Sequence, residues 1–141
     1  MIEVVNEHPR YRVNKRDLVR LLRKTAEVEK KTIDVVTVVL VTDKHIAKVH
    51  RDYLNDPTAT DVITFDLSRT DEIGGDIVIS LDTATRQAAE YGVSLRQETG
   101  RLAVHGFLHL CGMSDKTKVQ RERMHQRENV HLIREGWLGK E

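Results

Sequence analysis

Two histidines at helical spacing constrain this chain more than any other feature. His105 and His109 lie four residues apart in the stretch HGFLHLCGMSD. On a helix this spacing rotates the two side chains by only about 40° and separates them by about 6 Å along the axis. Both imidazoles can then reach one small cation, and Gly112 is a residue type that commonly ends a helix. The stretch therefore predicts a helix that carries a metal site.

A third ligand is expected just beyond this helix, at Asp115. Two imidazole nitrogens and one carboxylate oxygen leave a fourth tetrahedral position open, as in catalytic rather than structural zinc sites. An aspartate in front of a helix is often only its N-cap, but a capping box at Thr117 already serves the next helix. His125 is the alternative third ligand if that helix folds back. We expect one divalent ion, zinc, at His105, His109 and Asp115.

The remaining sequence indicates one α+β domain over residues 1–141. Runs of branched residues predict strands at Ile2–Val5, Ile33–Thr42, Asp61–Leu67 and Asp76–Leu81, the last one after a turn at Gly74-Gly75. Capping residues and apolar periodicity predict helices from Asn14 to about Lys30, from Thr42 or Asp43 to Asn55-Asp-Pro57, from Ser80 or Asp82 to Gly92, from Ser94 through the histidines, and from Lys118 to Arg134. This order predicts a small mixed sheet of about four strands covered by helices.

Three motifs resemble those of a known family. They are the HGFLHLCGMSD stretch, Thr60-Asp-Val-Ile-Thr-Phe65 and Gly75-Asp-Ile-Val-Ile-Ser80. They are similar, in order and spacing, to the HGxLHLxGxxH, TDVLSF and GDIxIS motifs of the YbeY family, bacterial metal-dependent endoribonucleases. The resemblance implies a metal site near one end of the sheet and single-strand-specific RNA cleavage. It further implies a role in rRNA maturation, notably of the small subunit, and in ribosome quality control.

This chain departs from the family pattern at two positions. The third ligand of the family is usually histidine, whereas the matching residue here is Asp115. An arginine usually follows the tyrosine upstream of the TDV motif, and Leu54 follows Tyr53 here. A carboxylate keeps a metal ligand but adds a negative charge, while leucine removes a guanidinium that would bind substrate or assist catalysis. Metal binding is therefore expected to follow the family more closely than the catalytic mechanism does.

The residue that moves protons during catalysis stays open, and so does the choice between water and a 2′-hydroxyl as nucleophile. Glu98 lies seven residues before His105 and shares its helix face, at about 10 Å along the axis. That distance suits a supporting or substrate-side role, although an ordinary exposed glutamate is the simpler interpretation. Asp61, Asp66 and Asp76 are candidates to accept a hydrogen bond from a metal histidine, but capping or turn roles fit them equally well.

Basic residues gather near the N-terminus although the net charge is only +1. Between Arg10 and Lys24 there are seven basic residues and one acid, Asp17. Such a run is usually a solvated helix face. Given the resemblance, the alternative is contact with RNA phosphates, for which the candidates are Arg16, Arg20 and Arg23. His8, His45, His50 and His131 have no supporting pattern and are expected at the surface or in the core.

Several classes of protein are excluded or disfavoured. The single cysteine, Cys111, excludes an internal disulfide and a CxxC zinc cluster, and it lies opposite the histidine face, so a buried structural thiol is expected. No apolar run approaches the roughly 20 residues of a membrane span, and the first residues are too charged for a signal peptide.

We expect a cytoplasmic protein whose partners are single-stranded RNA, specifically rRNA, and the ribosomal subunit or assembly factors, with no DNA or membrane.

Two other functions compete with RNA cleavage. A zinc peptidase of the HExxH class would use the same helix but needs a glutamate as base, and Gly106 stands at that position. A non-catalytic ribosome-assembly factor would keep the metal for stability and the basic residues for RNA, and Leu54 favours this alternative.

Overall fold

The structure is a computed structural model that describes residues 1–56 and 60–139. Within these residues the chain forms four strands and five helices in the predicted order. They are β1 (Ile2–Asn6), α1 (Lys15–Glu29), β2 (Ile33–Val41), α2 (Asp43–Leu54), β3 (Val62–Asp66), β4 (Ile73–Ser80), α3 (Leu81–Tyr91), α4 (Leu95–Leu110) and α5 (Lys118–Arg134). None of the described helices is long and apolar enough to cross a membrane.

The strands form one mixed sheet in the order β1-β2-β4-β3. β1, β2 and β4 run parallel to one another, and β3 pairs antiparallel with β4. The parallel pairs are joined by crossovers that contain helices, whereas β3 and β4 form a hairpin. The predicted fold class, an α+β domain with a small mixed sheet, is confirmed.

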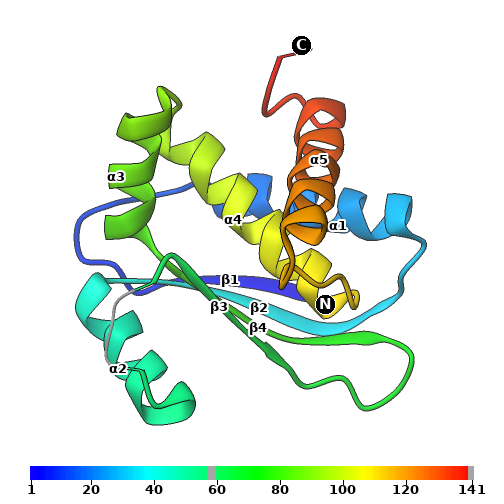
Figure 1. The fold of residues 1–141 in the computed structure, drawn as a ribbon, viewed down its shortest axis with the longest axis horizontal. Coiled ribbons are helices and arrows are strands. Elements are labelled where there is room, and N and C mark those ends of the chain that lie inside the picture. Colours follow the sequence, from blue (N-terminus) through cyan, green and yellow to red (C-terminus); the bar gives the residue numbers. More distant parts are fainter. Residues whose placement is uncertain (57–59, 140–141) are drawn as a thin grey trace.

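The two faces of the sheet are covered unequally (Figure 1). α1, α4 and α5 lie on one face, where the alternate residues Val36, Val38 and Leu40 of β2 are fully buried. α2 lies on the other face and contributes Ile46 to a smaller buried cluster. Val35 on that second face remains 44% exposed. Helices therefore lie on both faces of the sheet, as predicted, and the first face is covered more completely.

Polar caps set the helix starts where the sequence predicts them. The N-cap side chains accept a backbone N–H near the start of their helices, and they are Asn14, Thr42, Ser80, Ser94 and Thr117. Ser94 and Thr117 each form a complete capping box with the glutamine three residues later. Thr42 and Ser80, rather than Asp43 and Asp82, are thus the caps of α2 and α3. Pro57, part of the predicted end of α2, lies outside the described residues.

The hairpin corrects two strand boundaries. The sequence predicts a turn at Gly74 and Gly75, but β4 begins at Ile73 and includes both glycines. A Cβ atom at Gly75 would lie 2.2 Å from the Phe65 carbonyl oxygen, so glycine is needed for the pairing of the strands. Leu67 lies beyond the end of β3 and is 59% exposed. A close backbone approach, rather than a turn, thus explains the glycine pair.

α4 lies directly against the sheet at Gly106. A Cβ atom there would come within 2.6 Å of Ile77 Cγ2 and 3.0 Å of Thr64 Cγ2. Position 106 therefore faces β3 and β4. The absence of a side chain lets the helix approach these strands closely enough to bury Phe107 and Leu108 beside it.

Candidate metal centre

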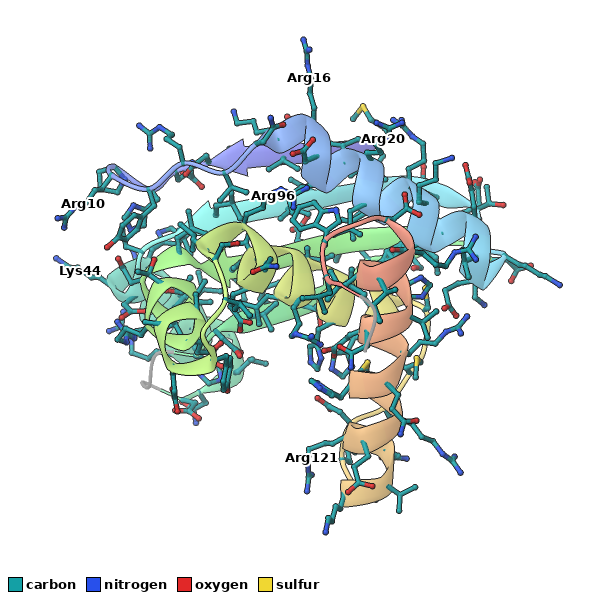
Figure 2. The ribbon with its side chains drawn as sticks, turned by 90° about the horizontal axis from the view of Figure 1, so that it is seen from above. Arg10, Arg16, Arg20, Lys44, Arg96 and Arg121 are labelled. Carbon is teal, nitrogen blue, oxygen red and sulfur yellow. The ribbon has the colours of Figure 1, made fainter. Side chains whose placement is uncertain are left out.

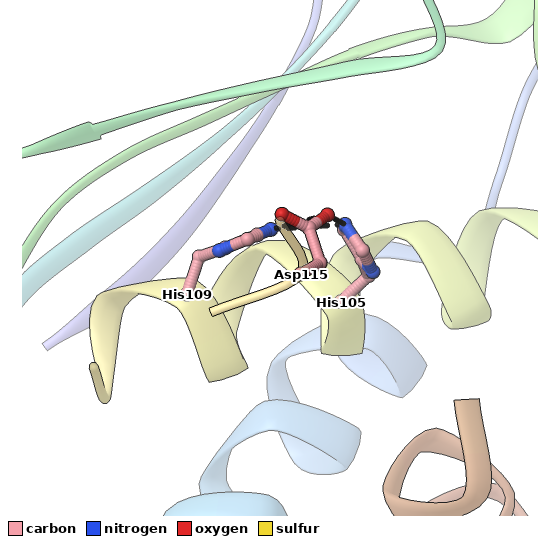
Figure 3. A group of neighbouring side chains, drawn as sticks. All are labelled: His105, His109 and Asp115. Carbon is pink, nitrogen blue, oxygen red and sulfur yellow. Dashed lines mark hydrogen bonds and ion pairs between the residues drawn. The ribbon is translucent and has the colours of Figure 1, made fainter. Parts of the chain in front are cut away.

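The end of α4 and the loop after it bring His105, His109 and Asp115 together (Figure 3). The two Nε2 atoms are 3.1 Å apart, and Asp115 Oδ2 lies 3.1 Å from His109 Nε2 and 3.4 Å from His105 Nε2. Bonds of about 2.0–2.1 Å to a tetrahedral zinc ion place its ligand atoms about 3.3 Å apart. The spacing of these three atoms therefore suits a single divalent ion.

A tight turn at Gly112 returns the chain to the histidines. Gly112 has a φ of +98°, in the left-handed region that glycine adopts without strain. Its N–H donates to the His109 carbonyl oxygen, and the Met113 N–H donates to the Leu108 carbonyl oxygen. These bonds close the end of α4 as a glycine-terminated helix end does. The turn predicted at Gly112 is present, and Asp115 comes back over the helix face.

The second nitrogen of each imidazole has its own acceptor. His109 Nδ1 is 3.0 Å from the Met113 carbonyl oxygen, and His105 Nδ1 is 2.7 Å from Glu128 Oε2. A carbonyl or carboxylate oxygen only accepts, so each Nδ1 carries the hydrogen and each Nε2 presents a lone pair. Two lone pairs and a carboxylate oxygen then converge on one point, where a cation relieves their repulsion. The donor set fits a divalent metal ion.

Glu128 of α5 is the residue that orients His105. Its carboxylate is almost fully buried and also accepts from Arg101 Nη1 at 3.0 Å. Burial alone would lower the pKa of His105. The hydrogen bond and the charge of Glu128, with the charges of Asp115 and Asp61, raise it by more, so the pKa of His105 is raised overall. The imidazole is correspondingly a better metal ligand.

This partner of His105 was missed by sequence reasoning, which considered three aspartates. These aspartates have other partners among the described residues. Asp66 accepts the Ser68 N–H in a turn, and Asp61 accepts from the side-chain amide of Gln87. Asp76 lies in β4, paired with Phe65. The acceptor comes from a separate helix, 23 residues beyond His105, and only the packing of α5 on α4 identifies it.

Glu98 is buried, which corrects the expectation of an exposed helix glutamate. Only 3% of its surface is accessible. Burial raises the pKa of Glu98 to about 7, with the charge of Arg101 opposing the rise and those of Asp61 and Glu128 adding to it. Glu98 lines the same groove as His105 and Asp115, and a supporting or substrate-side role for it stays a prediction.

The groove is lined by residues of α3, α4 and α5. Figure 2 shows from above that α4 lies between the other two helices. The volume of the groove is about 390 Å³. His105 and Asp115 lie at one part of it, and Glu98 lies two helical turns away along α4. The basic side chains that line it are Arg101 and Arg121. The side chains of His105, His109 and Asp115 keep 24%, 25% and 36% of their surface accessible, so a ligand can reach the site.

The basic residues predicted to contact RNA lie elsewhere. Arg16, Arg20 and Arg23 are on α1, and none of them lines the groove. In Figure 2, Arg16 and Arg20 lie on the opposite side of α4 from Arg121. Arg20 shares a separate polar hollow with Arg96 and two other basic residues. Contact of α1 with RNA stays a prediction.

Other sequence candidates have simpler roles. The side chain of His125 is 62% exposed, and this residue is outside the ligand cluster formed by the described residues. Cys111 is partly buried, outside the cluster, and burial raises its pKa to about 11, so it is an unreactive thiol.

His8 and His131 are core residues, paired with Asp82 and Glu29. The remaining histidines lie on α2. Leu54, at the usual arginine position, is 54% exposed.

The fold and the cluster define an α+β protein in which a helix packed on the sheet and the loop after it bring together three accessible side chains that could hold a divalent ion. A sequence profile described as endoribonuclease YbeY matches residues 3–135. The chain belongs to this family.

Similar proteins agree with this assignment. An endoribonuclease YbeY of Bacteroides thetaiotaomicron is 36% identical over 85% of this chain and 88% of its own length. One from Bacillus velezensis is 42% identical over 66% of this chain and 67% of its own length. A solution structure of a protein from Thermotoga maritima superimposes with a TM-score of 0.60 at 23% identity, covering 94% of this chain and 89% of that one. The last comparison shows a shared fold.

Proposed function

We propose that this protein is a metal-dependent endoribonuclease that cleaves single-stranded RNA in the groove on α4. One observation carries the proposal: the Nε2 atoms of both histidines and a carboxylate oxygen of Asp115 converge beside the groove, with both Nδ1 atoms already held by acceptors. Membership of the YbeY family and the names of the relatives supply the RNA substrate.

The protein's own residues have separable tasks in this reaction. His105, His109 and Asp115 would hold the ion, which when bound supplies a Lewis acid that offsets charge developing on a phosphoryl group. Arg121 lines the groove; its Nη1 donates to the Lys116 carbonyl oxygen, and its remaining N–H groups can hold a neighbouring phosphate. Arg101 is already engaged by Glu128 and Asn129, so its task is to fix the residue that orients His105.

The proposal extends to the biological setting. It comprises zinc as the ion, rRNA as the substrate with the ribosomal subunit or assembly factors as partners, and a cytoplasmic location. It also treats residues 1–141 as one domain. The support is the family membership together with the three-ligand cluster, whose two nitrogen donors favour zinc over magnesium or calcium.

The test is cleavage of labelled RNA with and without a chelator. We expect single-stranded RNA to be cut, its duplex and casein to stay intact, and the activity to vanish with the chelator and return with added zinc. RNA that is bound but never cut would favour the non-catalytic assembly factor and contradict the proposal. Cleavage of casein would favour a peptidase.

RNA binding is expected to weaken when the basic residues of α1 are neutralised. The triple variant Arg16→Gln, Arg20→Gln, Arg23→Gln should bind a single-stranded oligonucleotide less tightly. It should also lower the slope of log affinity against log salt by about 0.7 for each phosphate that the variant no longer contacts, because fewer counterions are released. Fluorescence anisotropy over a series of salt concentrations measures both quantities.

The matched control removes three charges on the opposite side of the sheet. Lys44, Lys48 and Arg51 are on α2, and their change to glutamine alters the net charge equally. We expect this control to keep the slope of the parent protein. Equal affinity and slope in the α1 variant and the parent would show that α1 is only a solvated helix face.

A further inference from the structure

The groove contains a second polar feature, away from the metal ligands. The carboxyl of Glu98 is almost fully buried yet lines the groove, and no hydrogen bond or ion pair to it is found among the described residues. A buried carboxyl without a partner is costly, since its lost hydration is not replaced. The groove is the direction from which a ligand can supply the missing donors.

Neighbouring polar side chains are already occupied and do not fill this role. Gln97 accepts the Ser94 N–H and donates to the Trp137 carbonyl oxygen. Arg101 donates to Glu128 and to another residue of α5. Glu98 is therefore a buried polar side chain of the groove whose hydrogen-bonding capacity is unused within the described residues.

Glu98 shares its groove with apolar side chains, and nearby charges act on it. Tyr91, Val93, Leu102 and Leu138 are among the residues that line the groove, and Tyr91 is 61% exposed. The charged groups that act on Glu98 are Asp61, which precedes β3, Glu128 of α5 and Arg101 of α4. The two carboxylates repel a phosphate, and the guanidinium of Arg101 does not offset them because it is already paired with Glu128. Apolar walls instead accept a flat ring, as aromatic and aliphatic side chains accept unstacked bases.

We propose that the Glu98 end of the groove binds one unpaired guanine base of the RNA through the edge that carries its N1–H and N2–H donors. This inference rests on the proposed endoribonuclease function. Guanine has two adjacent donors on its pairing edge, which match the two oxygens of the ionised carboxylate, and donation of two hydrogen bonds favours that ionised form. Adenine, cytosine and uracil each place an acceptor beside their donor there, and that acceptor would face the second oxygen.

The position of Glu98 fits a base close to the bond that is cut. Glu98 and His105 are separated by about 10 Å along α4, comparable with the reach from a phosphate to the pairing edge of a neighbouring base. An RNA strand with its phosphate at the metal ligands can thus place a base against Glu98. The groove would then select the nucleotide next to the cleaved phosphate.

The first test uses the unmodified protein and a single base. The substrates are unstructured oligouridylates that carry one central guanosine, inosine, 7-deazaguanosine or no replacement. We expect guanosine to raise kcat/KM about tenfold or more over uridine alone, within the range that a bidentate contact to one base gives. Inosine, which lacks the N2 amino donor, should lose most of this advantage. 7-Deazaguanosine, which keeps the pairing edge, should retain it.

The second test changes the residue. Glu98→Gln keeps the size of the side chain but replaces one acceptor oxygen with a donor, so the ratio between guanosine and uridine substrates should fall toward one. Glu90→Gln, an exposed acid on α3, is the matched control and should keep the ratio of the parent. Thermal unfolding of both variants checks that the fold is retained.

The outcomes separate this inference from the proposed function. Cleavage of oligouridylate alone reports the endoribonuclease, and binding of each oligonucleotide measured by anisotropy reports base selection even without cleavage. Equal cleavage and binding of guanosine and uridine substrates overturns the inference, and so does a guanosine preference that survives in Glu98→Gln. Binding that follows the predicted order without any cleavage contradicts only the proposed function.

Discussion

A protein that combines His105→Ala and His109→Ala is expected to lose both its divalent ion and its ribonuclease activity. The double change removes two of three ligand atoms and leaves one carboxylate, which holds a transition metal poorly. Loss of a residue that merely orients a ligand lowers metal affinity about 10- to 100-fold, so loss of two ligands should lower it further. Elemental analysis of protein purified without added metal should give one ion per chain for the parent and none for the variant.

Histidines outside the cluster provide the control for this experiment. His45→Ala combined with His50→Ala also removes two imidazoles, and both residues lie on α2, outside the ligand cluster. This control should keep the metal content of the parent. His105→Ala leaves the buried Glu128 carboxylate without one of its partners, so thermal unfolding of each variant checks that the fold is retained. Unchanged stoichiometry in the His105, His109 variant would refute the metal site.

Asp115 is expected to give opposite results with two substitutions. Asp115→Ala should lose most metal affinity, since two histidines alone hold zinc poorly. Asp115→His should keep the metal, favour zinc more strongly, and move the pH–activity profile to lower pH. The physical reason is charge: a carboxylate donates a full negative charge and an imidazole none, so the ion in the histidine variant is more positive and acidifies bound water more.

Metal titrations and pH profiles of both variants measure these effects. Asp71→Ala, an exposed aspartate in the loop between β3 and β4, is the control for loss of one negative charge and should bind the ion normally. If Asp115→Ala binds metal as tightly as the parent, Asp115 is only a loop residue. His125 would then become the third-ligand candidate, although this requires its exposed side chain to turn toward the histidines.

Features encoded by neighbouring residues were predictable from the sequence. The caps at Ser94 and Thr117, the pair of histidines and the turn at Gly112 each depend on a few residues close together in the chain, and the structure contains all of them. The succession of strands and helices along the chain followed from the same local patterns, and it led to a mixed sheet. Local hydrogen bonding and periodicity were therefore sufficient to predict most of the fold and the three residues of the ligand cluster.

Features that depend on packing between distant elements were not predictable. Glu98 has the helical position of a surface residue, and it is buried because α3 and α5 stand on either side of α4. Glu128 reaches His105 only across the contact of α5 with α4. Gly75 resembled a turn residue because the approach of the Phe65 carbonyl group is a long-range contact. In each case the environment is created by a different helix or strand.

The contact of Gly106 with the sheet limits which side chain position 106 of this chain can carry. A peptidase of the HExxH class needs a glutamate at this position, but even a methyl group would lie 2.6 Å from Ile77 Cγ2. A single substitution would therefore displace α4 and its histidines instead of adding a base. Ile77 and Thr64 would have to become smaller in the same lineage. In this chain, a base at position 106 would therefore require a change in the packing of α4 on β3 and β4 as well as the new side chain.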